Sequence, residues 1–189
     1  LALAAPLLGW LASTTRAFAQ ATGMPRKANL PDTDWLHYAG DLASTRYSPI
    51  DQIGPDNFKS LEIAWRFETS PYGPRPEYVL QVTPLTAKGR MYFTAGARRS
   101  VVCIDAATGE VIWSHREVEG GRAAKSPRQG PGRGLAYWSD GKEERILYVT
   151  IGYRLVALDA KTGDLVAGFG EGGIVDLRRD DDQDMDLIN

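Results

Sequence analysis

Two copies of one short pattern decide the fold: Cys103–Gly109 reads CIDAATG and Ala157–Gly163 reads ALDAKTG. Each copy follows a run rich in aromatic and β-branched residues, the composition of a β-strand. The Asp side chain can accept backbone N–H bonds, and Gly supplies the positive φ that a tight connection often needs. The Asp-x-x-Thr-Gly segments therefore predict two equivalent turns in a duplicated β unit.

The duplication extends upstream of both turns. Met91–Gly96 (MYFTAG) aligns with Leu147–Gly152 (LYVTIG), and both predict a strand that precedes the strand entering the turn. The spacing of Asp105 and Asp159 is close to the roughly 40 to 50 residues of one propeller blade. We therefore predict an all-β chain built from propeller blades.

A tryptophan follows the first turn, at the end of a predicted strand that finishes at Trp113. Trp65 ends a similar run beginning at Leu61, which we interpret as the strand of a third, partial unit. Such a tryptophan gives a thin sheet a large apolar contact and an indole N–H that can reach a neighbouring blade. In the last unit Asp164–Phe169 (DLVAGF) runs on without a tryptophan, so the repeat is degenerate there.

The length of the chain accommodates only part of a propeller. On the usual scale of about four to eight blades, these residues hold about two to three, which cannot close a ring and would leave strand edges unpaired. The sequence also starts at Leu1 without an initiating Met. We therefore expect an N-terminal piece of a larger propeller.

The N-terminal residues resemble the end of a secretory signal peptide. An apolar run over residues 1–12 is followed by the A-x-A site Ala17–Ala19. A short membrane anchor or a buried helix is the alternative, but the run is well short of the ~20 residues that a span needs. We expect residues 1–19 to be a partial signal peptide cleaved after Ala19, residues 20–33 a linker and residues 34–189 an incomplete propeller domain.

Charge and cysteine content exclude several classes of function. With 22 basic and 24 acidic residues the net charge is −2, which gives no reason to expect nucleic acid or an anionic membrane surface as a partner. A single cysteine, Cys103, excludes a disulfide or a cysteine-rich metal site within this sequence. Cys103 aligns with Ala157, so we expect a small buried packing residue rather than a reactive thiol.

From Asp34 to Asp176 the sequence resembles the quinoprotein dehydrogenases, periplasmic propeller enzymes that use pyrroloquinoline quinone (PQQ) and a calcium ion. The resemblance implies a ring that is eight-bladed when complete. It rests on several segments in the same order, which are Asp34-Trp35, His37–Asp41 (HYAGD), Arg46–Pro49 (RYSP), Gln81–Leu85 (QVTPL), the two Asp-x-x-Thr-Gly turns and Arg133–Trp138 (RGLAYW).

The resemblance assigns a cofactor role to three residues. Arg133 matches an arginine at the acidic periphery of the quinone, where a guanidinium can fork onto a carboxylate. Thr150 matches a threonine whose hydroxyl bonds the cofactor. Gln81 stands where the alcohol-oxidising branch has a glutamate and the glucose-oxidising branch an amide. The alternatives are a surface arginine for Arg133 and an ordinary strand threonine for Thr150, since Thr94 holds the same place in the first unit.

One departure from the family pattern bears on the substrate. The alcohol branch has two adjacent cysteines shortly before the arginine, whereas residues 126–132 read SPRQGPG. With Gln81, this favours the membrane glucose dehydrogenase type, which oxidises aldoses or polyols and passes electrons to ubiquinone. The several transmembrane helices of that type are missing from the sequence. We therefore expect a soluble or peripherally bound periplasmic relative at the inner membrane, with ubiquinone or cytochrome c as acceptor.

The implied chemistry is oxidation of a C–H group that bears a hydroxyl, with a carboxylate base and calcium as a Lewis acid. In the family the base and the calcium ligands lie in later blades, so we expect them beyond Asn189 and expect this piece alone to be inactive. The acidic run over residues 180–186 (DDDQDMD) lacks the glycine and closing glutamate of a calcium loop, which favours a solvated loop. His37 and His115 lack metal-ligand spacing.

Two noncatalytic alternatives remain. An exported propeller can act as a scaffold for outer-membrane protein assembly and keep the same turns, but it has no reason to keep Arg133–Trp138, and Ala19-Gln20 offers no cysteine for lipidation. A degenerate quinoprotein that binds sugars or partners is the other. No Cys-x-x-Cys-His haem site occurs in this sequence.

Overall fold

The computed structural model describes residues 34–73 and 79–179, so the predicted signal peptide and acidic run lie outside the described residues. Two four-stranded antiparallel sheets form its core, with strands in sequence order across each sheet. The first sheet holds β1 (Leu85–Ala87), β2 (Arg90–Ala95), β3 (Ser100–Asp105) and β4 (Val111–His115). The second holds β5 (Ala136–Ser139), β6 (Glu144–Val149), β7 (Arg154–Asp159) and β8 (Ile174–Asp176).

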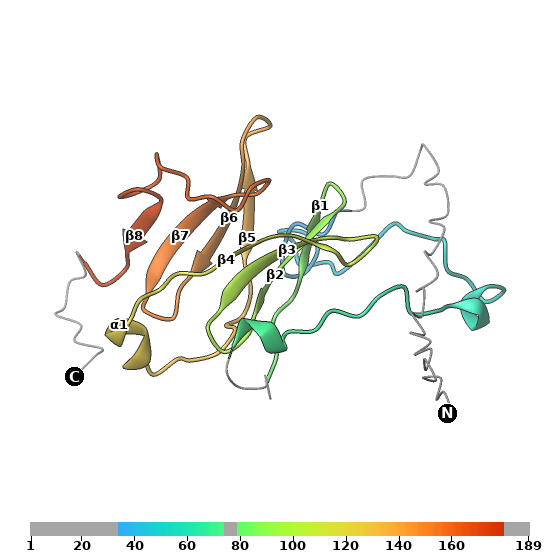
Figure 1. Ribbon diagram of the computed structural model, residues 1–189. Helices are drawn as coiled ribbons and strands as arrows, with labels where there is room; N and C mark the ends of the chain where they lie inside the picture. Colours follow the sequence, from blue (N-terminus) through green and yellow to red (C-terminus); the bar gives the residue numbers. More distant parts are fainter. Residues whose placement is uncertain (1–33, 74–78, 180–189) are drawn as a thin grey trace, which may run out of the picture.

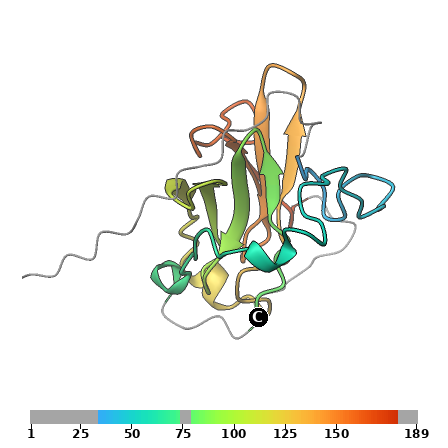
Figure 2. The same cartoon turned by 90° about the vertical axis from the view of Figure 1, so that its right-hand side faces the viewer.

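The two sheets pack face to face as adjacent blades (Figures 1 and 2). In the described residues, the single-turn helices η1 (Phe58–Ser60) and η2 (Ser70–Tyr72) precede β1, and α1 (Gly121–Ala124) lies in the connection between β4 and β5. Each blade is a meander, because each strand pairs antiparallel with the next strand along the chain. The predicted all-β blade architecture is confirmed.

Strand β3 is buried on both faces, because it lies in the middle of the packed layers. Val101 and Cys103 belong to the hydrophobic cluster shared with the second sheet. Val102 and Ile104 point the other way, into a cluster covered by Trp65 and neighbouring aromatic residues. Cys103 is fully buried and unpaired, which confirms the packing role expected from its alignment with alanine.

The two repeated turns have the predicted geometry. Asp105 Oδ1 accepts hydrogen bonds from the backbone N–H groups of Ala107 and Thr108, both at 2.9 Å. Asp159 accepts the equivalent pair in the second blade. Gly109 closes the first turn at a φ of +76°, a conformation that strains any residue with a Cβ.

The tryptophans join one unit to the next. Trp65 Nε1 donates to the carbonyl of Ala106 at 3.2 Å, and Trp113 Nε1 donates to the carbonyl of Ala160 at 3.2 Å. This confirms the predicted contact with a neighbouring blade. The strand expected over Leu61–Trp65 does not form, because no segment in the described part of the chain pairs with its backbone.

The last strand of the second blade explains the degenerate repeat. Leu165 forms an isolated bridge with Leu158, and the chain then leaves the sheet as a loop over residues 166–173. Pairing resumes in β8, where Val156 lies opposite Ile174. Ala167, which holds the position of Trp113, falls in that loop. The outer strand therefore lies later than its counterpart in the first blade.

Candidate functional site

Antiparallel order brings the three predicted site residues to one end of the blades. Gln81 lies just before β1, Arg133 just before β5 and Thr150 just after β6. Leu85 pairs with Tyr92 and Ala136 with Leu147, so the starts of β1 and β5 lie beside the ends of β2 and β6. We call this the site end. It also carries the β2–β3 turn, the β6–β7 turn and the connection from β4 to β5.

The segments that hold Gln81 and Arg133 are close neighbours. A Cβ on Gly134 would lie 3.7 Å from the carbonyl oxygen of Thr83, so the start of the second blade runs beside the start of the first. Gln81 and Arg133 are both exposed. Within residues 34–73 and 79–179, neither side chain has a hydrogen-bond or ion-pair partner, which leaves a guanidinium and an amide free for a ligand.

Thr150 has a different environment. Its side chain is buried, and its hydroxyl donates to Glu119 Oε1 at 2.8 Å while accepting from the N–H of Arg154 at 3.0 Å. Because the one hydroxyl proton is already used, the geometry gives Thr150 a role in holding the β6–β7 turn. The structure therefore groups Gln81 with Arg133 and gives Thr150 internal partners.

Glu119, which the sequence did not single out, fixes that turn. Its side chain is only 2% exposed, and Oε2 accepts from the N–H of Gly152 at 2.7 Å. A Cβ at Gly152 would lie 2.6 Å from Glu119 Oε1, so a side chain at this position would displace the carboxylate. A buried carboxylate is tolerated here because several donors satisfy it.

Arg122 of α1 also holds the β6–β7 turn and links it to β8. Its guanidinium donates to both oxygens of Asp176 in β8, with 2.7 Å for Nη1 to Oδ2, and to the carbonyl of Gly152. The two groups stabilise each other in their charged forms: hydrogen bonding to Arg122 lowers the pKa of Asp176, and bonding to Asp176 raises the pKa of Arg122. A fork of this kind is a strong, oriented ion pair.

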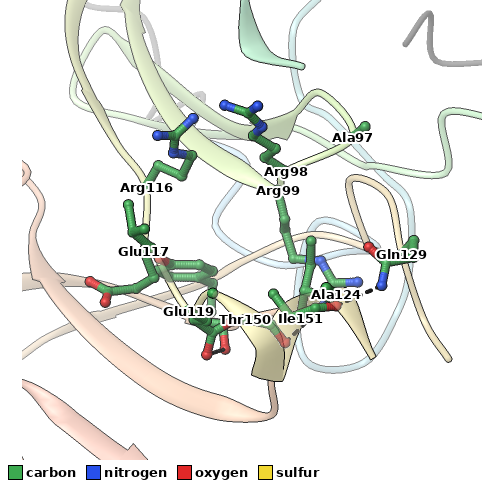
Figure 3. Close-up of a pocket in the computed structure, with 14 residues that line it drawn as sticks. Ala97, Arg98, Arg99, Arg116, Glu117, Glu119, Ala124, Gln129, Thr150 and Ile151 are labelled. Carbon is green, nitrogen blue, oxygen red and sulfur yellow. Dashed lines mark hydrogen bonds between the residues drawn. The ribbon is translucent and has the colours of Figure 1, made fainter. Parts of the chain in front are cut away.

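A cavity of about 420 Å³ opens beneath the β4–β5 connection (Figure 3). Arg98 and Arg116 end on one side of it, whereas Glu117 and Glu119 lie lower in the view. Glu117 is bound by His115 at 2.9 Å, so His115 has a structural partner. Neither Gln81 nor Arg133 lines the cavity, which is therefore separate from the exposed pair.

The family model described as "PQQ: Glucose/ethanol/alcohol dehydrogenase, beta-propeller domain" matches residues 35–187, which includes both blades. This chain belongs to that PQQ dehydrogenase family. The family resemblance carried by the sequence segments is thus confirmed, and the face-to-face blades are part of a quinoprotein propeller.

Individual quinoproteins are similar over most of this chain. The glycerol dehydrogenase large subunit of Gluconobacter oxydans (strain 621H) is 35% identical over 155 residues, which is 76% of this chain and 20% of that protein. The dehydrogenase subunit of the quinone alcohol dehydrogenase of the same strain is 37% identical over 134 residues, covering 70% of this chain and 16% of the relative. The solved quinohemoprotein alcohol dehydrogenase of Comamonas testosteroni superposes with a TM-score of 0.62 at 28% identity, over 80% of this chain and 20% of that one.

The chain spans about a fifth of the length of these relatives. A quinoprotein glucose dehydrogenase of Gluconobacter oxydans is 29% identical over 79% of this chain, below the glycerol and alcohol enzymes. The quinoprotein relatives therefore do not single out the glucose branch that Gln81 and the missing cysteines favoured.

Residues 34–73 and 79–179 contain neither a metal-binding cluster nor a membrane-spanning helix. No three His, Cys, Asp or Glu side chains of residues 34–73 and 79–179 are placed to hold a metal ion. No helix in the same ranges is both long and apolar enough to cross a bilayer. The calcium expected for a quinoprotein is thus not assigned to any residue of these two blades.

Proposed function

We propose that the protein to which these blades belong is a PQQ-dependent dehydrogenase that oxidises the CH–OH group of a polyol or alcohol. Family membership across both blades is the observation that carries this proposal. The substrate class follows the glycerol and alcohol dehydrogenases among the similar proteins. Glucose is the second candidate, supported by the amide at Gln81 and by the similarity to a glucose dehydrogenase.

Arg133 and Gln81 fit the cofactor. PQQ is an acidic, planar quinone, and an exposed guanidinium without a partner in the described part of the chain suits a carboxylate on its periphery. Gln81 adds an amide that can donate or accept nearby. When bound, the quinone supplies the oxidising power by accepting two electrons. In this proposal Arg133 binds and orients the cofactor.

Calcium, the electron acceptor and the location are further parts of the proposal. Calcium prefers hard oxygen ligands and would act as the Lewis acid, held by residues other than those described. We propose export to the periplasm with cleavage after Ala19, peripheral association with the inner membrane, and ubiquinone or cytochrome c as acceptor. A signal-like N-terminus and the resemblance to periplasmic quinoproteins support this placement.

The direct test uses the full-length protein prepared without cofactor. PQQ and calcium are added separately and together, and dye reduction is followed with glycerol, ethanol and glucose. We expect turnover only with both additions and higher kcat/KM for glycerol or ethanol than for glucose. A preference for glucose would restore the glucose branch. No turnover and no shift of the melting temperature with PQQ would instead support a noncatalytic scaffold or sugar-binding propeller.

A further inference from the structure

Arg99, in the β2–β3 turn of the first blade, reaches into the second blade and donates four hydrogen bonds from its guanidinium. Nε donates to the carbonyl of Gly130 at 3.1 Å and Nη2 to the carbonyl of Arg128 at 3.3 Å. Nη1 donates to the carbonyls of Val149 and Thr150, both at 3.1 Å. One side chain thus ties the loop before β5 to the end of β6.

Only an arginine suits this position. Its planar guanidinium presents five N–H donors in a fixed fork, whereas a lysine ammonium is a compact charge that cannot reach four separated carbonyls in this way. Burial lowers the pKa of the Arg99 guanidinium, yet an arginine remains charged at neutral pH. Because Arg99 is partly buried, a guanidinium without partners would be costly there, and the four carbonyls supply those partners.

The backbone of Gly132 also packs against the Arg99 guanidinium. A Cβ at Gly132 would lie 2.9 Å from Arg99 Nε, and the residue has a φ of +81°. The guanidinium therefore packs directly on the backbone immediately before Arg133. The neighbouring Arg98 contrasts with it, since Arg98 is exposed and has no hydrogen-bond partner among the described residues.

We infer that Arg99 is a positioning residue that fixes the Gly130–Gly132 backbone and thereby aims Arg133 at the cofactor. This inference rests on the proposed function, because Arg133 needs a fixed direction only if it binds a ligand. Arg99, a residue of the first blade, would then affect cofactor affinity through Arg133 at the start of the second blade.

The test compares full-length wild type with Arg99→Gln, Arg99→Lys and a control, Arg145→Gln. Arg145 is also a partly buried arginine, but it stacks on Trp138 and pairs with Glu143 at the other end of the second blade. Hydrogen exchange of the cofactor-free proteins reports on peptides covering residues 128–134. PQQ affinity is measured by fluorescence titration, and kcat at saturating PQQ.

We expect Arg99→Gln to accelerate exchange in residues 128–134 and to weaken PQQ binding about 10- to 100-fold, the effect that residues supporting a metal ligand have on metal affinity. Arg99→Lys should restore little of the exchange protection or of the PQQ affinity, because a lysine ammonium lacks the planar set of donors of the guanidinium. The value of kcat at saturating PQQ should stay close to that of wild type, and Arg145→Gln should change neither the exchange of residues 128–134 nor PQQ affinity.

Unchanged exchange in residues 128–134, or unchanged PQQ affinity despite faster exchange, would overturn the inference. If Arg99→Gln does not fold, Gly132→Ala tests the same contact by crowding Arg99 Nε, and we expect the same two effects from it. Wild-type protein that does not bind PQQ would refute the proposed function instead. The exchange comparison would then still decide whether Arg99 fixes the loop.

Discussion

The indole of Trp113 lies directly on the backbone of Gly163 in the neighbouring blade: a Cβ at Gly163 would be 2.6 Å from Trp113 Cε3. Gly163 therefore serves two needs at once. It adopts the positive φ of +78° that closes the Asp-x-x-Thr-Gly turn, and it leaves a flat surface for the tryptophan. Trp65 and Gly109 repeat the relationship one unit earlier, with a Cβ distance of 2.7 Å to Trp65 Cδ2.

Gly163→Ala should destabilise the protein by about 2 to 5 kcal/mol, the sum of positive-φ strain and overpacking against a ring. The matched control is Gly141→Ala, where φ is +90° but nothing lies within 4 Å of the added Cβ. The free energy of unfolding of Gly141→Ala should fall only by the part that comes from positive-φ strain. Thermal unfolding of both variants measures the difference, and equal losses would contradict the packing argument.

Trp113 and Tyr92 should show a non-additive loss. Trp113 Nε1 and Tyr92 Oη both donate to the carbonyl of Ala160, at 3.2 and 3.1 Å. Removing one donor leaves that carbonyl satisfied, whereas removing both leaves it buried and unpaired, which costs about 1 to 3 kcal/mol. In a double-mutant cycle with Trp113→Phe and Tyr92→Phe, the double variant should be less stable than the two single losses predict. Strict additivity would show that the two donors do not share this acceptor.

The Arg122–Asp176 pair should make stability depend on pH in the acid range. The pKa of Asp176 is lowered in the folded protein, chiefly by hydrogen bonds from Arg122. The contribution of Asp176 to the free energy of unfolding is therefore complete above its pKa in the unfolded chain, about 4. This contribution is lost as the pH falls toward and through the lower pKa of the folded protein. Melting temperatures of wild type and Asp176→Asn should differ most near neutral pH and converge below about pH 4. A constant difference down to pH 3 would exclude this linkage.

Cys103 should be unreactive in the folded protein. Burial raises the pKa of its thiol to about 11, and none of its surface is exposed. At pH 8 the peptide containing Cys103 should remain unmodified by iodoacetamide in native protein and become modified in urea, as measured by mass spectrometry. Cys103→Ala should be tolerated better than Cys103→Asp, since the second copy of the repeat has Ala157 here. Rapid native modification would contradict the buried placement.

Arg133→Gln should weaken PQQ binding about 10- to 100-fold, because a hydrogen bond to a charged group is worth about 1.5 to 3 kcal/mol. Arg133→Lys should restore part of the affinity through charge alone. Lys142→Gln is the control, an exposed charge in the β5–β6 turn at the opposite end of the blade. Fluorescence titration of full-length protein with PQQ measures all three. Wild-type affinity in Arg133→Gln would remove Arg133 from the proposed site.

Local chemistry explains why much of the fold could be predicted. Asp105 and Asp159 cap turns through bonds to residues two and three positions along, and glycine is required there by backbone sterics alone. The strands around these turns follow from their aromatic and β-branched composition. The family followed from several such segments in one order.

The features that the sequence did not predict depend on contacts between residues far apart along the chain. Thr150 stays a predicted cofactor residue, but the sequence did not reveal that Glu119, from the β4–β5 connection, takes its hydroxyl proton. Leu61–Trp65 has the composition of a strand but lacks a partner in the described part of the chain. The outer strand of the second blade resumes only at Ile174, after a loop that the repeat did not predict.

The sequence by itself determined the repeated turn, the blade and the family, because these depend on residues close together along the chain. Only the tertiary structure decided that Arg99 holds the backbone beside Arg133 and that Gly163 seats Trp113. Both relationships join residues of different blades. A guanidinium binds any carbonyl and an indole packs on any bare backbone, so their partners are fixed by which surfaces the packed sheets bring together.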